Sequence, residues 1–135
     1  MAKLFVAENP CESCPYRRDV PSGIWHESEY EKLRAYDSDG FDRPLAAFLC
    51  HHSPDMKQQA ACRGWLTVHR ETVAVRIAMM TGQVTPDEVY TEVSAPLFAS
   101  GNEAADAGIK GVKRPKAKAR KVIDRLLDKK MKRNG

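Results

Sequence analysis

The chain has 135 residues, of which 42% are hydrophobic and 30% charged, and its formal net charge at pH 7 is +4. This length suits one domain of common size and leaves no room for a second hydrophobic core. No apolar run approaches the roughly 18 residues that a membrane-spanning helix needs, and the N-terminal apolar stretch is too short for a secretory signal, so we expect a cytoplasmic protein without a membrane partner.

Charge is distributed unevenly along the chain. Residues 1–108 contain 10 Lys and Arg against 16 Asp and Glu, a balance of −6, whereas residues 109–135 contain 12 against 2, a balance of +10. A block of like charge is typical of a solvated arm that binds phosphates or an acidic protein surface. We therefore expect a four-cysteine body over residues 1–108 and a basic C-terminal tail over residues 109–135.

The predicted elements begin after an opening segment, residues 1–22, that three prolines keep extended or turn-rich. Near-helical spacing of apolar residues predicts a helix over residues 26–36, which ends at a turn-forming sequence over residues 37–40. Residues 45–50 are a short apolar run that is either a strand or a helical turn, because a run of this length has no diagnostic period.

The strongest helical pattern covers residues 60–81, where apolar residues form a broad face and Gly82 is a stop signal, so we expect the central helix there. Thr85, with a proline directly after it and an acid three residues later, predicts another helix start. A short helix over residues 100–108 and a basic helix after Pro115 complete the elements. One side of the basic helix is apolar, and we expect it to dock on the body or on a partner. That side consists of Ala119, Val122, Ile123, Leu126, Leu127 and Met131.

Four cysteines stand in a Cys-x2-Cys pair, followed by 35 residues and then by Cys-x11-Cys. A two-residue gap lets two thiolates reach one ion, because a tight turn brings the sulfurs together and frees backbone amides to hydrogen-bond them. The alternatives to a metal site are ordinary buried thiols and disulfides. Disulfides are rare in cytosolic proteins. We expect one metal centre in a mainly α domain, joining an irregular N-terminal lobe to the central helix. Its expected ligands are Cys11, Cys14, Cys50 and Cys62.

Two kinds of centre compete for these ligands. Zinc is the commoner ion for four cysteines, but its fingers and ribbons usually show two short-spaced pairs. The proline after Cys14 and the aromatic residues Tyr16 and Trp65 suit a dry [4Fe-4S] cluster, which we expect, with one Zn²⁺ as the alternative. Around the ligands, we expect His51 and His52 to donate hydrogen bonds and Trp65 to cover the centre.

The segment Cys11–Arg17, read as Cys-Glu-Ser-Cys-Pro-Tyr-Arg and followed by Gly23-Ile24-Trp25, resembles the WhiB-like regulators of actinobacteria and their phages. That family pairs a Cys-x2-Cys-Pro-x-Arg segment with a Gly-Val-Trp turn. The resemblance implies that Cys11 and Cys14 bind a [4Fe-4S] cluster, that the protein contacts the principal sigma factor of RNA polymerase, and that a basic tail binds DNA.

The positions of the other two cysteines differ from that family, in which one cysteine precedes the pair and another follows it within a few residues. The full arrangement adds Phe48-Leu49-Cys50-His51, Cys62-Arg63-Gly64-Trp65 and a Ser-Gly-Asn-Glu-Ala segment at residues 100–104. This arrangement is similar to a small four-cysteine family of actinobacterial and actinophage proteins without an assigned function. The similarity spans most of the body.

Seven positive side chains occur within twelve residues at the start of the tail, with no acid among them. Each phosphate that such a side chain neutralises releases counterions, so we expect salt-dependent binding of DNA or RNA. A solvated, solubilising tail is the alternative, and a membrane-surface helix is disfavoured because the apolar side lacks an aromatic anchor. The seven residues are Lys110, Lys113, Arg114, Lys116, Lys118, Arg120 and Lys121.

The sequence contains no phosphate-binding glycine loop, zincin histidine pair or nucleophile elbow, so we do not expect an enzyme. Two functions stay open. The first is a nucleic-acid-associated or transcription-regulator-like protein, which the resemblance suggests is phage-encoded, with the metal holding the body and the tail contacting nucleic acid. The second is a zinc-stabilised interaction module that binds RNA polymerase or another host protein.

Overall fold

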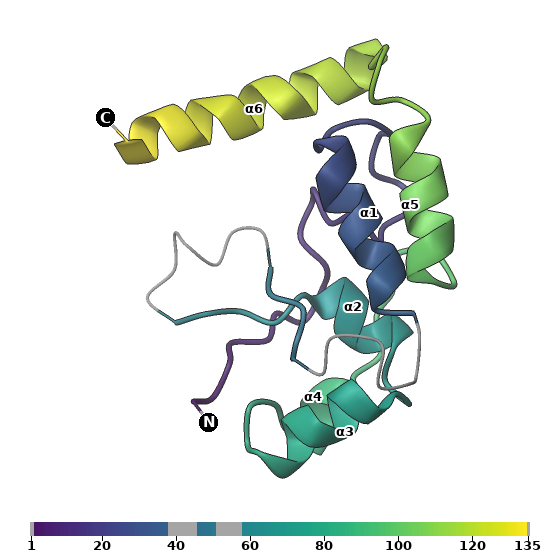
Figure 1. Ribbon diagram of the computed structural model, residues 1–135. Coiled ribbons are helices and arrows are strands. Elements are labelled where there is room, and N and C mark those ends of the chain that lie inside the picture. Colours follow the sequence, from purple (N-terminus) through teal and green to yellow (C-terminus); the bar gives the residue numbers. More distant parts are fainter. Residues whose placement is uncertain (1, 38–45, 51–57, 135) are drawn as a thin grey trace.

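The computed structural model describes residues 2–37, 46–50 and 58–134 of the chain (Figure 1). Within these ranges the protein is mainly helical, with isolated strand bridges in place of a sheet, which confirms the expected mainly α class. None of the helices in these ranges combines the length and the apolar composition that a membrane crossing requires.

The first helix, α1 (Glu27–Ala35), confirms the helix expected over residues 26–36. It begins at His26, whose imidazole Nδ1 accepts a hydrogen bond from the Ser28 N–H at 3.1 Å. This side-chain acceptor satisfies one of the backbone amides that a helix leaves unpaired in its first turn. His26 itself is exposed, as a surface cap is expected to be.

Helix α1 packs along α5 (Gly101–Ile109), which confirms the helix expected over residues 100–108 (Figure 1). The two helices approach closely because Gly108 has no side chain; a Cβ there would lie 2.1 Å from the Tyr30 ring. At the edge of the pair, Arg34 Nη2 lies 2.7 Å from Asp106 Oδ1. The pair forms one wall of the N-terminal lobe.

The prediction of a single central helix over residues 60–81 is wrong. The structure has two helices there, α2 (Arg63–Val68) and α3 (Val73–Met80). Cys62 is the N-cap of α2, one position before the helix, whereas a helix over residues 60–81 would place it in the first turn. Helix α2 buries Trp65 and Leu66 of the expected apolar face, but α3 buries Ala74, Val75 and Ala78 and leaves Met80 exposed.

A turn at His69–Thr72 separates α2 from α3. The Thr72 N–H and the Thr72 Oγ1 both donate to the His69 carbonyl, at 3.0 and 2.7 Å. His69 has φ −110° and ψ 25°, outside helical values, and its buried ring lies 2.8 Å from Asp37 Oδ1. This contact between distant segments explains why local periodicity did not predict the break.

The structure agrees with the predicted helix stop at Gly82 and the predicted helix start at Thr85. Gly82 follows α3 with φ +80°, a left-handed conformation that glycine adopts without a steric cost. Helix α4 (Pro86–Val89) begins with the expected capping box, in which Thr85 Oγ1 accepts from the Glu88 N–H and Glu88 Oε1 accepts from the Thr85 N–H. These helix boundaries follow from local chemistry alone.

The N-terminal lobe is irregular, as expected, and short extended segments hold it together. Phe5 pairs in parallel with Ala60, and Leu49 pairs in antiparallel fashion with Ala61. The expected apolar run at residues 45–50 is therefore strand-like at Leu49, the point that sequence periodicity left open. The two neighbouring alanines lie between the N-terminal segment and this run.

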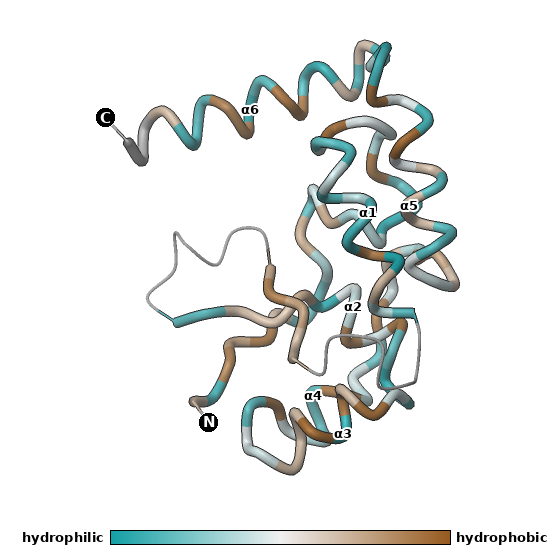
Figure 2. Tube along the Cα trace, viewed as in Figure 1, coloured by the Kyte–Doolittle hydropathy of each residue, from teal (hydrophilic) through white to brown (hydrophobic). Residues whose placement is uncertain are grey.

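Aromatic rings fill the centre of the lobe. Tyr16 and Trp65 are both 0% exposed, and the Tyr16 ring stands edge-on to the rings of Phe48 and His69. Tyr36 stands edge-on to Trp65 and Phe48. Aromatic side chains bury large areas, and Trp65 and Tyr16 are among the largest fully buried side chains. Figure 2 shows further hydrophobic positions along the N-terminal segment and in α3.

The last helix, α6 (Ala117–Asn134), confirms the expected basic C-terminal helix and extends away from α5 (Figure 1). Its apolar side is covered only near its start: Ala119 is 1% exposed, whereas Leu127 is 53% and Met131 71% exposed. Val122, Ile123 and Leu126 are partly buried. The structure thus covers the start of this side, and docking of the rest on the body or on a partner stays a prediction.

The boundary expected between residues 108 and 109 falls inside the last turn of α5. Beyond that helix the chain stays on the body, because the Gly111 N–H donates to Ser22 Oγ at 2.9 Å. Ile109 and Val112 also pack against the core. The basic segment leaves the body only after Val112.

Candidate metal centre

The first two cysteines lie in a tight turn of the N-terminal lobe. The Cys14 N–H donates to the Cys11 carbonyl at 3.1 Å, and the Arg17 N–H donates to the Cys14 carbonyl at the same distance. Trp25 Nε1 anchors the turn from outside by donating to the Ser13 carbonyl at 2.9 Å. Cys14 is buried and Cys11 is half-buried, and their thiols hydrogen-bond with each other.

Cys62 brings a third thiol to this turn from the start of α2. Its Sγ lies 3.8 Å from the Sγ of Cys14, although 48 positions separate the two residues in the chain. The same Sγ accepts a hydrogen bond from the Trp65 N–H at 3.5 Å, so it acts as the cap of α2. A backbone N–H aimed at a sulfur is the arrangement that stabilises a thiolate.

The pKa of the Cys14 thiol lies well above its ordinary value. Its hydrogen bonds with the thiols of Cys11 and Cys62 are the largest causes, and burial adds to them. A thiol in this setting stays protonated unless a positive charge arrives to stabilise the thiolate. A metal cation supplies that charge and displaces the proton.

Cys50 reaches the same side of the lobe through backbone pairing. The Cys50 N–H donates to the Ala60 carbonyl at 2.7 Å, and the Cys62 N–H donates to the Phe48 carbonyl at 2.8 Å. Because side chains alternate along paired strands, Cys50 and Cys62 lie on one face of this ladder as diagonal neighbours. The register thus places the fourth cysteine on the same face as the third.

Gly64 allows α2 to press against the cysteine turn. A Cβ at this position would lie 2.8 Å from Cys14 Sγ and 2.7 Å from Tyr16 Cβ, closer than ordinary contacts permit. The sequence points to this glycine only as part of the Cys62-Arg63-Gly64-Trp65 segment and predicts no role for it. A Cys-x-Gly-Trp string is the only local signal that could have identified it.

Aromatic side chains close the site. Trp65, expected to cover the centre, is fully buried one turn after Cys62. Within the described ranges, Trp65 Nε1 and Tyr16 Oη are buried without a hydrogen-bond partner, and burial is the largest cause of the raised pKa of Tyr16. The other expected neighbours, His51 and His52, lie outside the described residues.

The donor set fits a thiophilic metal. Four thiolates around one zinc at a Zn–S length of about 2.3 Å stand about 3.8 Å apart, and the Cys14–Cys62 separation is 3.8 Å. In a [4Fe-4S] cluster each thiolate binds its own iron, so the sulfurs stand farther apart. Among the described residues, no group of three or more Cys, His, Asp or Glu side chains is already spaced to hold an ion. Metal binding therefore requires the remaining thiols to close on the Cys14–Cys62 pair.

A second polar cluster, which sequence reasoning missed, lies beside the aromatic core. Asp37 accepts hydrogen bonds from the Gly101 and Asn102 N–H groups at 2.7 and 2.6 Å, and its Oδ1 lies 2.8 Å from Nε2 of the buried His69. It therefore joins α1, α5 and the end of α2. No local sequence signal connects these segments, because each partner comes from a different part of the chain.

The seven basic residues expected to bind nucleic acid are all exposed. They occupy the connection between α5 and α6 and the first turns of α6. None of them forms an ion pair within the part of the chain that the structure describes. Farther along α6, Arg125 and Lys129 approach Glu12 of the cysteine turn at 3.7 and 3.8 Å. These two residues of α6 lie outside the predicted set of seven and approach an acid of the body.

No curated protein and no solved structure matches the chain significantly. A model described as a family of unknown function, DUF6283, matches residues 6–124. This range contains the four cysteines, Gly64, the Asp37 cluster and the seven basic residues, so the features described above lie inside the shared region. The chain therefore belongs to the DUF6283 family.

Proposed function

We propose that the chain is a nucleic-acid-associated regulator whose body is organised by one cysteine-bound metal centre. The observation that carries this proposal is the convergence of thiols from distant segments. Cys14 and Cys62 are in contact, Cys11 hydrogen-bonds with Cys14, and Cys50 shares a ladder face with Cys62. In a domain this small, metal-binding free energy becomes folding free energy, because the unfolded chain does not present a formed site.

Two observations favour different metals at this centre. The Cys-x2-Cys-Pro segment and the dry aromatic surroundings support a [4Fe-4S] cluster, which would add redox chemistry. The 3.8 Å separation of Cys14 and Cys62 supports a single zinc ion, which would serve as a structural clamp. In either case the residues of this chain supply thiolates, a backbone N–H from Trp65 and a covering of aromatic rings.

The nucleic-acid part of the proposal rests on the basic connection between α5 and α6. Seven exposed cations without ion pairs in the described ranges form a surface that attracts phosphates. Positive side chains in the first turn of α6 face an unfavourable helix dipole, which an anion bound there would relieve. We place this activity in the cytoplasm, where thiols stay reduced and available to a metal.

The local resemblance to WhiB-like regulators supports a role in transcription, with RNA polymerase or another host protein as a second partner. The alternative is a zinc-stabilised interaction module in which the tail only adds charge. The partly exposed apolar side of α6 supports this alternative, because a protein partner could cover it.

The test combines metal analysis with DNA binding on the same preparation. Protein purified without oxygen is analysed for iron, sulfide and zinc, and its affinity for arbitrary duplex DNA is measured at several salt concentrations. The proposal predicts a stoichiometric metal and an affinity that falls steeply with salt. Metal without DNA binding at low salt would leave the interaction module, and the absence of both would reject the proposal.

A further inference from the structure

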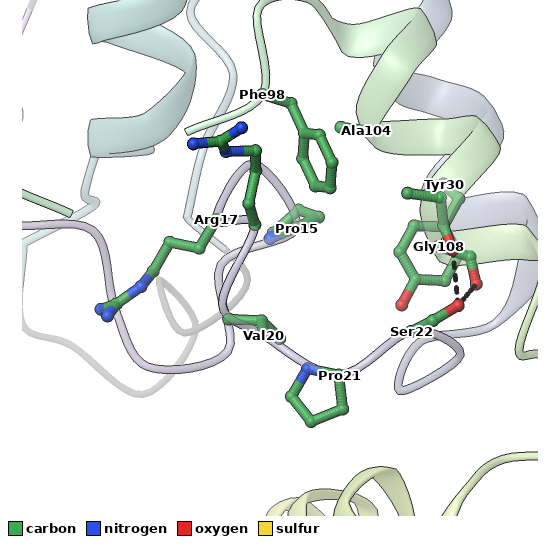
Figure 3. A pocket seen from close by; sticks show the side chains of 11 residues that line it. Pro15, Arg17, Val20, Pro21, Ser22, Tyr30, Phe98, Ala104 and Gly108 are labelled. Atoms are coloured by element: carbon green, nitrogen blue, oxygen red, sulfur yellow. Dashed lines mark hydrogen bonds between the residues drawn. The ribbon is translucent and has the colours of Figure 1, made fainter. Parts of the chain in front are cut away.

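A small pocket lies between the segment that follows Cys14 and the α1–α5 pair (Figure 3). Its volume is about 200 Å³. Nonpolar groups make most of the lining, and Arg17, Arg18, Ser22 and Tyr30 add polar groups. The lining includes Pro15, Val20, Pro21, Phe98, Ala104 and Ala107.

The walls of the pocket are fixed by hydrogen bonds. The Arg18 N–H donates to the Pro96 carbonyl and the Phe98 N–H to the Tyr16 carbonyl, both at 2.9 Å, which holds the Phe98 segment against the cysteine turn. On the opposite side, Ser22 Oγ donates to the carbonyls of Ala107 and Gly108 (Figure 3). Two prolines stiffen the remaining wall. The pocket is therefore formed before any ligand arrives.

The two arginines at the pocket are not equivalent. Arg17 is neutralised, because its Nε and Nη2 lie 2.8 and 2.7 Å from the two carboxylate oxygens of Asp19 and its Nη1 donates to the Pro10 carbonyl. The side chain of Arg18 is exposed and has no ion-pair partner within the described ranges. In a body with a charge balance of −6, this pocket thus carries an uncompensated positive charge.

We propose that this pocket binds a short acidic segment of another protein, with one large apolar side chain in the pocket and a neighbouring carboxylate on Arg18. The volume is below the roughly 300–1,000 Å³ typical of small-molecule sites and suits a single anchoring side chain. The charge of Arg18 specifies an acid beside the anchor. This inference goes beyond the proposed function, because it requires neither nucleic acid nor a metal.

Peptide binding to the full-length protein as purified tests the proposal. The probe is a fluorescent heptapeptide with one leucine preceded by two glutamates and otherwise composed of glycine and serine. Matched peptides replace the leucine by serine, or the glutamates by lysines. Fluorescence anisotropy at increasing protein concentration measures each affinity.

Two variants locate the binding. Arg18→Glu reverses the free charge at an exposed position, and Ala107→Phe fills the pocket from α5. Arg76→Glu, an exposed arginine on α3 without an ion pair in the described ranges, is the matched charge control. Because Ala107→Phe could disturb folding, its melting temperature is measured, and Arg18→Glu alone is sufficient for the test.

The proposal predicts that the Glu–Leu peptide binds, that either peptide substitution weakens binding, and that Arg18→Glu weakens it by about fivefold or more whereas Arg76→Glu has no effect. Equal binding of the lysine peptide, no binding by any peptide, or an unchanged affinity of Arg18→Glu would overturn it. Self-association of the wild-type chain that Ala107→Phe abolishes would also overturn it, because a second copy would then occupy the pocket.

Discussion

Gly64 shows how a single absent side chain positions the thiols of the proposed metal centre. Helix α2 starts directly after Cys62, so any change in how closely α2 approaches the cysteine turn also moves the Cys62 thiol. The atoms that a Cβ at Gly64 would meet are Cys14 Sγ and Tyr16 Cβ, both on the cysteine turn. The Cys14 and Cys62 thiols can therefore be in contact only if α2 approaches the cysteine turn closely at Gly64.

Replacement of Gly64 by alanine tests this requirement. Alanine is the better helix former by about 1 kcal/mol, so the substitution would stabilise α2 if space were available. We expect instead a destabilisation of about 1–3 kcal/mol from overpacking, together with a lower metal content. Denaturant unfolding and metal analysis measure the two effects.

The matched control is Gly82→Ala. A Cβ at Gly82 meets no atom within 4 Å, but its φ of +80° strains any other residue. This variant should lose about 1 kcal/mol while keeping its metal. If Gly64→Ala were as stable as the wild type and fully loaded, the tight contact at α2 would not position the thiols.

Asp37 is the residue whose loss should weaken the packing of α1, α5 and α2 together. Asp37→Ala removes the acceptor for two backbone amides of α5 and for the buried His69 ring. Since the buried His69 ring and the amide of the buried Gly101 would lose their acceptor, we expect a loss of about 2–4 kcal/mol in the free energy of unfolding. Chemical denaturation of the variant measures this loss.

Asp106→Ala is the control for Asp37, because it removes an exposed carboxylate that pairs with Arg34 at 2.7 Å. Exposed ion pairs contribute at most about 1 kcal/mol, so this variant should be nearly as stable as the wild type. Equal losses for the two variants would show that the Asp37 cluster is an ordinary surface contact.

Among the secondary-structure elements, those with local signals were predicted and those set by distant contacts were not. The capping box at Thr85 and the cap at Ser100 specify helix starts within four residues of chain, and both helices begin there. The break between α2 and α3 depends on a contact of His69 with Asp37, 32 residues away. The direction in which Cys50 points depends on the pairing of its backbone with Ala60. The spacing of apolar residues in the sequence does not predict this pairing.

Helix α6 is the element that should be removable. Truncation after Val112 deletes the basic connection and α6, but keeps Ile109, Gly111 and Val112, which contact the body. Of the deleted side chains in the described ranges, only Ala119 is fully buried, so the core should lose about 1 kcal/mol or less. Salt-dependent DNA binding should disappear while metal content is retained.

Truncation after Ile109 provides the comparison, because it also removes the Gly111 N–H donor to Ser22 and the packing of Val112. This shorter chain should melt at a lower temperature than the chain truncated after Val112. DNA binding that survives either truncation would place the nucleic-acid surface on the body.

In the molecule as a whole, the residues of the proposed metal centre and those of the proposed nucleic-acid surface lie in parts of opposite charge. The cysteines and the aromatic core lie in the acidic part of the chain, and the seven cations of the proposed nucleic-acid surface lie in the basic part. Glu12 is the point where these parts meet, since the cysteine turn there approaches Arg125 and Lys129. This separation should allow the proposed binding of nucleic acid to be altered without changing the proposed metal centre.

Neutralising four exposed cations of the connection and the first turn of α6 should change the salt dependence in a calculable way. Each phosphate contact contributes about −0.9 to the slope of log affinity against log salt, so four substitutions to glutamine should reduce the slope by up to about 3.6. The double variant Lys32→Gln with Arg76→Gln, on exposed body positions, should leave the slope unchanged. An equal effect of both sets would mean that only net charge matters. The four residues are Lys113, Arg114, Lys116 and Lys118.

The metal content of protein purified without oxygen, measured beside the thermal stability of Cys14→Ser, tests the central claim most directly. The account predicts either about one zinc or about four irons with four sulfides per wild-type chain. It also predicts that Cys14→Ser loses this metal and melts at a much lower temperature, because metal binding and folding are coupled. A wild-type chain that unfolds cooperatively without stoichiometric metal, and a Cys14→Ser variant of equal stability, would contradict it.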